Sequence, residues 1–168
     1  ALKLGDRIVL MKDGAIVQSG TAEEILTKPA NDYVAKFVQD VDMTKVITAE
    51  SVMLKSKAVA YYETDGPKAA LHKMKQSAIS TIFVRKDRQL YGVVTADDCA
   101  AAAKRGDPTL EKIVNPEIET VTADTPAADI IPLLARLSYP LPVVDENHKL
   151  KGVIIKGSLL AGLSERGT

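Results

Sequence analysis

The chain of 168 residues lacks several features that define common classes of protein. A single cysteine, Cys99, excludes an internal disulfide framework and a zinc site built from several cysteines, and it fits a reducing compartment. The 22 basic and 22 acidic residues balance, so there is no basic excess of the kind that indicates nucleic-acid binding. No apolar run approaches the roughly 18 residues of a membrane-spanning helix, and the first residues do not resemble a signal peptide.

Catalytic motifs are missing as well. The sequence contains no G-x-x-x-x-G-K-[ST] phosphate-binding loop, and neither His72 nor His148 has a second ligand at metal-binding spacing. We therefore expect no ATP hydrolysis by this chain, no catalytic residue and no metal site. The sequence opens at "ALKLGDRIVLM" without an initiator methionine, so we expect it to be part of a longer protein.

The first 42 residues form a pattern of their own. Two short apolar runs, residues 7–11 and 15–20, flank the turn sequence "KDG" and predict a β-hairpin. Thr21 and Glu24 have the spacing of a capping box, which predicts that a helix begins there. A second short helix is expected at about residues 31–39. A hairpin with two short helices is too small to bury a core of its own, so we expect it to need a partner.

Most of the remaining sequence is repeated. "LYGVVTADD" at residues 90–98 returns as "LKGVIIKGS" at residues 150–158, and the offset of 60 holds without a gap from about residue 59 onward. Apolar residues at i, i+3, i+4 and i+7 form a helical stripe in residues 67–74 and again in 127–134. Each copy therefore predicts strand, helix, strand, strand, helix. Because such a sheet needs covering, we expect the two copies to pack together with approximate two-fold symmetry.

These patterns resemble two known protein families. The string "GDRIVLMKDGAIVQSGTAEEILTKPANDYVAKFV" is similar to the end of an ABC-transporter ATPase domain. The string "GVVTADD", inside a 60-residue β-α-β-β-α repeat, resembles the CBS domain. The expected fold class is α+β, with tandem CBS domains preceded by a β-hairpin and helix remnant of an ABC ATPase domain. We expect the ATPase end at residues 1–42, the first CBS repeat at 43–114 and the second at 115–168.

Joined, the two parts resemble the ATP-binding subunits of osmoregulated glycine betaine/proline importers. The ending "LPVVDENHKLKGVIIKGSLLAGLSERG" is similar to theirs in detail. This resemblance implies a parent protein that drives uptake of a compatible solute by ATP hydrolysis. It also implies a homodimer in the cytoplasm, at the inner face of the cell membrane, working with a membrane permease subunit. The present chain would carry the regulatory part.

The resemblance to CBS domains implies that the polar end of the first repeated string, Thr95 to Asp98, binds the ligand. In nucleotide-binding CBS domains the residue matching Thr95 contacts phosphate and the residue matching Asp98 holds the ribose hydroxyls. The backbone around Ile79, Ser80 and Ile82 would then border the base, and AMP, ATP or cyclic di-AMP would be the regulatory ligand. Thr-x-x-Asp is also the spacing of a plain helix cap, which needs no ligand, so both interpretations stay open.

The second copy has lost this chemistry. Ile155 replaces the threonine and Ser158 replaces the aspartate, so no adenine nucleotide is expected there in the usual manner. Lys156 and Ser158 form a weaker candidate site for a different anion. Pro132 lies inside the second predicted helix, at about residues 126–137, where it predicts a kink or a late start.

Three functions remain open at this point. The chain is a sensor of an adenine nucleotide or a cyclic dinucleotide, or it senses ionic strength through its contact with an anionic lipid surface. The third hypothesis is a structural dimerisation module with no small ligand. An enzyme is the weakest reading, because the first 42 residues do not resemble part of any CBS-containing enzyme.

Overall fold

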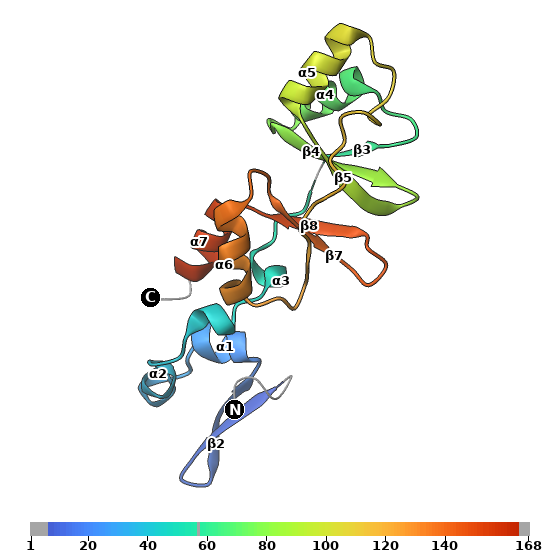
Figure 1. Ribbon diagram of the computed structural model, residues 1–168. Coiled ribbons are helices and arrows are strands. Elements are labelled where there is room, and N and C mark those ends of the chain that lie inside the picture. The colour runs from blue at the N-terminus through green and yellow to red at the C-terminus, as the bar shows by residue number, and fades with distance from the viewer. Residues whose placement is uncertain (1–6, 57, 165–168) are drawn as a thin grey trace.

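The computed structural model describes residues 7–56 and 58–164, which form three parts along one elongated molecule (Figure 1). The N-terminal segment consists of the hairpin β1 (Ile8–Lys12) and β2 (Ala15–Gly20) followed by the helices α1 (Ala22–Thr27) and α2 (Asp32–Val38). The first unit consists of β3 (Val59–Tyr61), α4 (Pro67–Gln76), β4 (Thr81–Lys86), β5 (Gln89–Thr95) and α5 (Ala96–Arg105). The second unit consists of β6 (Val121–Thr122), α6 (Ala127–Arg136), β7 (Leu141–Val144), β8 (Leu150–Ile154) and α7 (Lys156–Ser164).

The two units share one topology, which confirms the predicted α+β repeat. In each three-stranded sheet the middle strand pairs with the first strand in parallel and with the last strand antiparallel, in the orders β3-β4-β5 and β6-β7-β8. Most of each predicted helical stripe faces its sheet, because Met74 and Leu134 are buried at equivalent places in α4 and α6, but Ile131 of the second stripe is 40% exposed. Pro132 lies on the exposed side of α6, and the helix begins at Ala127 and continues past it, so the proline does not delay its start.

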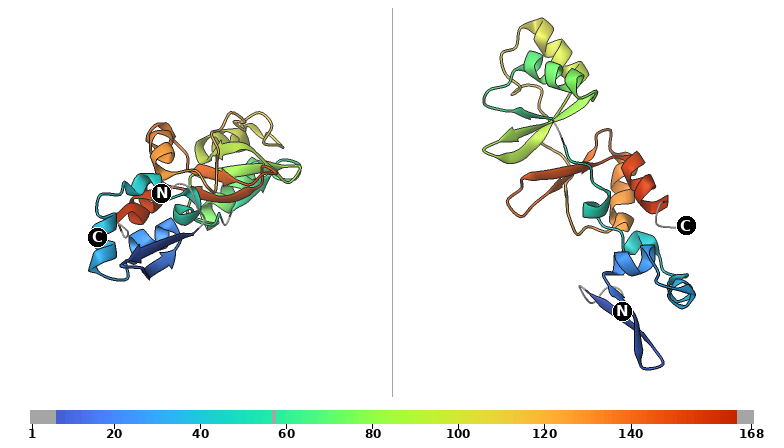
Figure 2. Two further views of the ribbon diagram at one scale, coloured as in Figure 1. Left: turned by 90° about the horizontal axis from the view of Figure 1, so that it is seen from below. Right: turned by 180° about the vertical axis from the view of Figure 1, so that it is seen from behind.

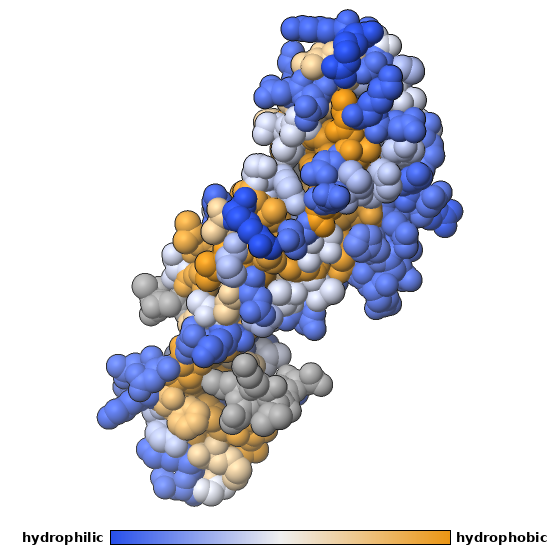
Figure 3. Space-filling view, in the orientation of Figure 1, coloured by the Kyte–Doolittle hydropathy of each residue, from blue (hydrophilic) through white to orange (hydrophobic). Residues whose placement is uncertain are grey.

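The N-terminal segment folds as its capping signals predict. Thr21 Oγ1 accepts a hydrogen bond from the Glu24 amide at 3.1 Å, and the Thr21 amide donates to Glu24 Oε2 at 2.8 Å. The segment buries a small cluster of its own, which the sequence argument did not foresee: Ile25, Leu26, Val34 and Val38. The outer face of the hairpin is nevertheless exposed. Its apolar residues Val9, Met11 and Ile16 are between 50% and 66% accessible, and apolar side chains gather on this lower part of the molecule in Figure 3.

The segments that lead into the two units exchange partners. Residues 43–54, called here the first lead-in, contain the short helices η1 (Met43–Lys45) and α3 (Ala49–Val52) and come just before the first unit. Their buried side chains Ile47 and Val52 nevertheless belong to the core of the second unit. Residues 109–115, the second lead-in, place Leu110 in the core of the first unit. The N-terminal segment consequently lies beside the second unit, with the first unit at the far end (Figures 1 and 2).

This exchange explains the repeated glycines. A Cβ atom on Gly92 would lie 2.4 Å from the carbonyl oxygen of Asn115 in the second lead-in. A Cβ atom on Gly152 would lie 2.8 Å from the carbonyl oxygen of Leu54 in the first lead-in. Each glycine therefore lets the backbone of a lead-in lie flat against the last strand of a sheet.

A separate cluster joins the two sheets. Phe83, Leu90 and Val93 of the first unit are buried together with Val144 of the second. The Phe83 ring packs edge-on against Tyr139, with the ring centroids 6.5 Å apart. The tips of the two hairpins are joined as well: the Leu90 amide donates to the His148 carbonyl at 2.8 Å, and Gln89 Nε2 donates to the Asn147 carbonyl at 3.0 Å.

Candidate ligand-binding cleft

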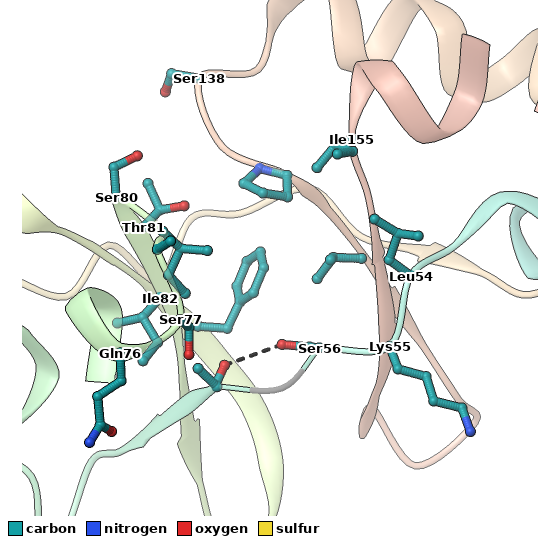
Figure 4. A pocket seen from close by; sticks show the side chains of 16 residues that line it. Leu54, Lys55, Ser56, Gln76, Ser77, Ser80, Thr81, Ile82, Ser138 and Ile155 are labelled. Atoms are coloured by element: carbon teal, nitrogen blue, oxygen red, sulfur yellow. Dashed lines mark hydrogen bonds between the residues drawn. The ribbon is translucent and has the colours of Figure 1, made fainter. Parts of the chain in front are cut away.

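A cleft of about 630 Å³ opens between the two units (Figure 4). The first unit contributes the end of α4, the turn after it and the start of β4. The second unit contributes the loop before β7 together with β8, and the last residues of the first lead-in and those after it complete the wall. The described residues that line the cleft are Leu54, Lys55, Ser56, Ala58, Gln76, Ser77, Ala78, Ile79, Ser80, Thr81, Ile82, Phe83, Ser138, Pro140, Val153 and Ile155.

The cleft combines apolar walls with a rim of hydroxyl groups. The first unit supplies the buried apolar side chains Ile82 and Phe83. Leu54 and Ile155 lie across the cleft from Ile82 (Figure 4). Among the described residues that line the cleft, Lys55 is the single charged one, and its side chain extends away from the centre in Figure 4. Apolar walls with a few hydroxyl groups suit a ring with polar edges.

Three of the predicted site residues, Ile79, Ser80 and Ile82, line this cleft. Thr95 and Asp98 do not line it, but they lie at the adjoining end of the sheet. Thr95 pairs with Thr81 across the β4–β5 ladder. The amide of the next residue, Ala96, donates to the Ser80 carbonyl at 2.8 Å.

The structure gives Thr95 and Asp98 a capping arrangement. Thr95 is the N-cap of α5, and its Oγ1 accepts a hydrogen bond from the Asp98 amide at 3.1 Å. The same hydroxyl donates to Asp98 Oδ2 at 2.6 Å. The two side chains thus satisfy each other and the first turn of the helix, and a ligand would have to replace the hydroxyl–carboxylate bond.

The second copy closes its helix end in a different way. Ser158 Oγ accepts from the Ile155 amide at 3.2 Å and donates to the Ile155 carbonyl at 3.0 Å, so its hydroxyl is engaged by the backbone. The Ile155 side chain lines the main cleft, although the sequence argument assigned it no role. Lys156 lines a neighbouring hollow of about 480 Å³ together with Tyr139 and Gly157.

Sequence reasoning missed the part of the wall that comes from the lead-in, and it expected walls from the second copy without naming the residues that form them. Pro140 carried a usable signal, because it lies 60 residues after Ser80, and the internal repeat makes the two positions equivalent. Leu54 and Ser56 carried none, because nothing local shows that a lead-in crosses to the other unit. Ser56 Oγ donates to the Ala58 carbonyl at 3.2 Å, which shapes the chain along this wall (Figure 4).

Cys99 is buried behind the first helix cap. Its burial, together with the nearby charge of Asp98, raises the pKa of the thiol from 9.0 to about 11. Between these two pH values the unfolded chain loses the thiol proton while the folded chain keeps it. The contribution of the thiol to stability is therefore complete below pH 9 and is lost as the pH rises.

A test of this pH dependence compares the protein with Cys99→Ala. The variant is expected to be less stable at pH 8, because it leaves a small cavity. That deficit should shrink above pH 9, by up to about 1.4 kcal/mol per pH unit, because only the parent chain carries the thiol. Urea unfolding of both proteins at pH 8 and pH 10 measures the deficit. A deficit that is equal at both pH values would contradict a raised thiol pKa.

Other kinds of site find no support in the residues described. No group of three or more His, Cys, Asp or Glu side chains within 7–56 and 58–164 is arranged to hold a metal ion. A search of the same part of the chain finds no helix with the length and apolar character needed to span a bilayer.

Comparison with known families decides the identity of the repeat. The model of the CBS domain matches residues 38–105 and 110–165, one match for each unit. The chain belongs to the CBS domain family. The predicted resemblance is therefore confirmed, and the two units are a CBS pair.

Relatives of this CBS pair are ATP-binding proteins of transport systems. The chain is 43% identical over 165 residues to the glycine betaine/carnitine transport ATP-binding protein GbuA of Listeria monocytogenes, covering 98% of this chain and 41% of that protein. It is 45% identical over 165 residues to the glycine betaine transport ATP-binding protein OpuAA of Bacillus subtilis, covering 98% and 39%. The chain thus spans about two fifths of the length of these relatives, and the predicted likeness to glycine betaine transport subunits is confirmed.

Solved structures with the same fold include CBS pairs. Staphylococcus aureus OpuCA is 26% identical with a TM-score of 0.60, covering 69% of this chain and 98% of that chain. CBSX2, which was solved in complex with AMP, is 22% identical with a TM-score of 0.61, covering 70% and 96%. At that identity the likeness to CBSX2 establishes the fold alone.

Proposed function

We propose that the cleft between the two CBS units binds an adenine nucleotide, namely AMP, ATP or cyclic di-AMP. The observation that carries this proposal is the cleft itself, whose volume of about 630 Å³ and apolar walls bordered by Ile79, Ser80 and Ile82 suit an adenine ring. The AMP complex of CBSX2, a protein of the same fold, supports the choice of ligand.

The polar parts of such a ligand would lie toward the helix cap. Thr95 and the first turn of α5 would contact phosphate, because the N-terminal turn of a helix attracts anions. Asp98 would turn from the Thr95 hydroxyl to the ribose hydroxyls. The second copy would contribute Ile155 as an apolar wall, with Lys156 and Ser158 as the weaker site for another anion. Binding would therefore saturate near one nucleotide per chain.

The proposed regulatory role rests on the proteins to which the CBS pair is similar. Over 98% of its length the chain is similar to ATP-binding proteins of glycine betaine transport. The complete protein would be a transport ATPase at the inner face of the cell membrane, coupled to a permease subunit, and the CBS pair would gate its ATP-driven uptake. The exposed hairpin face of Val9, Met11 and Ile16 would pack against the rest of the ATPase domain.

One observation favours a second candidate function. Because Thr95 and Asp98 already satisfy each other at 2.6 Å, the motif is complete as a helix cap without any ligand. The CBS pair would then serve as a dimerisation module. Ile131 on α6 and Leu160 on α7, which are 40% and 63% exposed, offer apolar contacts for a second copy.

Replacing Asp98 by alanine is expected to weaken nucleotide binding by about 1.5–3 kcal/mol, the usual worth of a hydrogen bond to a charged group. Calorimetric titration with AMP, ATP and cyclic di-AMP measures the loss. The matched control is Ser158→Ala at the equivalent position of the second copy, which should change the affinity little because that hydroxyl bonds only Ile155. If no nucleotide binds the parent chain below millimolar concentration, the nucleotide proposal fails and the dimerisation module stands.

A further inference from the structure

The first lead-in contacts the N-terminal segment, the core of the second unit and the cleft, which are the three regions that a regulatory domain has to connect. At its start, Met43 packs against both the cluster of the N-terminal segment and the core of the second unit. Val46 also packs against the N-terminal cluster. At its end, Leu54 lines the cleft, and Ser56 lines it two residues further on. A single short stretch therefore runs from the ATPase-like segment to the wall of the candidate ligand site.

The contact between this lead-in and the second unit is regular and closely fitted. The Ala49 amide donates to Thr125 and the Glu50 amide to Ala123, at 2.8 and 2.9 Å. Leu54 exchanges two backbone hydrogen bonds with Val153 on β8, at 2.8 and 2.9 Å. Val52 packs so closely on α7 that a Cβ atom at Gly162 would lie 2.5 Å from its Cγ1. The lead-in therefore extends the edge of the second sheet, and its buried side chains are part of the core of the second unit.

The second lead-in provides an internal comparison. Asn115 exchanges two backbone hydrogen bonds with Val93 on β5, at 2.9 and 3.0 Å, in the same way as Leu54 does with Val153. Residues 109–115 are absent from the lining of the cleft and from the N-terminal cluster. The two lead-ins thus share one kind of docking, but only the first has both connections.

We propose that docking of the first lead-in on β8 is the step that couples the cleft to the N-terminal segment. A ligand that contacts Leu54 and Ser56 favours the docked lead-in, and docking holds Met43 and Val46 in the N-terminal cluster. The coupling is a conformational equilibrium that both ends bias, as linkage requires. It rests on the proposed function for the nature of the signal, but the docking step itself is testable without any ligand.

The test locks each lead-in by a disulfide. Directly opposed residues that exchange both hydrogen bonds have Cα atoms about 5.5 Å apart, within the range that a disulfide spans. The Leu54→Cys/Val153→Cys chain is compared in its oxidised and reduced forms by amide hydrogen exchange. Oxidation is expected to slow exchange at Ile25, Leu26, Val34 and Val38 at least threefold. The control pair Val93→Cys/Asn115→Cys should leave these amides unchanged on oxidation.

A second variant shifts the equilibrium in the opposite direction and needs no cross-link. Gly152→Ala places a Cβ atom against the Leu54 carbonyl and should speed exchange at the same four amides more than in the core of the first unit. Gly92→Ala at the equivalent position should show the opposite order, with the larger effect in the core of the first unit. Equal exchange in the oxidised and reduced Leu54→Cys/Val153→Cys chain would overturn the coupling.

Adding AMP, ATP or cyclic di-AMP to the unmodified chain separates this inference from the proposed function. If a probe binds, it should slow exchange at the Leu54 and Val153 amides together with the four N-terminal amides, and protection confined to the cleft would overturn the coupling. If no probe binds, the proposed function fails, and the cross-link comparison alone decides whether the lead-in couples the two regions.

Discussion

Gly92→Ala is expected to lower the free energy of unfolding by about 3 kcal/mol, at the upper end of the cost of overpacking a tight site. The new Cβ atom would lie 2.4 Å from the Asn115 carbonyl oxygen and 2.8 Å from Val114 Cγ2, closer than van der Waals contact allows. The oxygen belongs to the backbone, and the Asn115 amide bonds Val93, so the lead-in has to shift as a whole. In a chain of this size the change corresponds to a fall in Tm of roughly 6–12 °C.

Gly157→Ala is the matched control. Its new Cβ atom would meet nothing closer than Ile155 Cδ1 at 3.9 Å, and the residue lies in helix α7. Alanine favours a helix over glycine by up to about 1 kcal/mol, so this variant should equal or exceed the parent chain in stability. Thermal unfolding followed by circular dichroism measures both variants. A Gly92→Ala protein that unfolds within about 2 °C of the parent, the low end of the shift expected for 1 kcal/mol, would show that the lead-in is not held against β5.

Gly92 and Gly152 show how far the sequence predicts the fold. The offset of 60 identifies Gly92 and Gly152 as equivalent, and it predicts correctly the order of strands and helices in each unit. It does not predict why glycine is needed. The atoms that exclude a side chain belong to Asn115 and Leu54, in lead-ins that cross to the other unit. The repeat shows that the two sheets are equivalent. It therefore does not show on which of the two sheets a given lead-in docks.

The candidate site, too, was predictable only in part from the sequence. Ile79, Ser80 and Ile82 were predictable, because they lie where the chain enters the strand beside the repeated turn, and all three line the cleft. The roles of Thr95 and Asp98 were not decided by spacing, since one arrangement serves both a cap and a ligand. Leu54 and Ser56 were out of reach, because their place in the wall depends on tertiary packing of the lead-in and leaves no local pattern.

Phe83 is the side chain on which the joint between the two units depends most. It is 4% exposed, it packs edge-on against Tyr139, and it lies in the cluster that also buries Val144 of the second unit. Phe83 also lines the cleft. The ring therefore connects the two sheets and helps to set the distance across which a ligand would bind.

Phe83→Ala is expected to lower the free energy of unfolding by about 3–5 kcal/mol, through lost burial and the cavity that remains. Phe37, the other phenylalanine of the chain, supplies the control, because it is 58% exposed on α2 and its replacement by alanine should change stability by less than about 0.5 kcal/mol. Urea unfolding followed by fluorescence of a dye attached near β7 and by circular dichroism reports both units. Because Phe83→Ala weakens the contact between the two units, dye fluorescence and circular dichroism should give separate transitions in this variant. In Phe37→Ala the two transitions should coincide. Equal losses in the two variants would mean that the sheets do not depend on this ring to stay together.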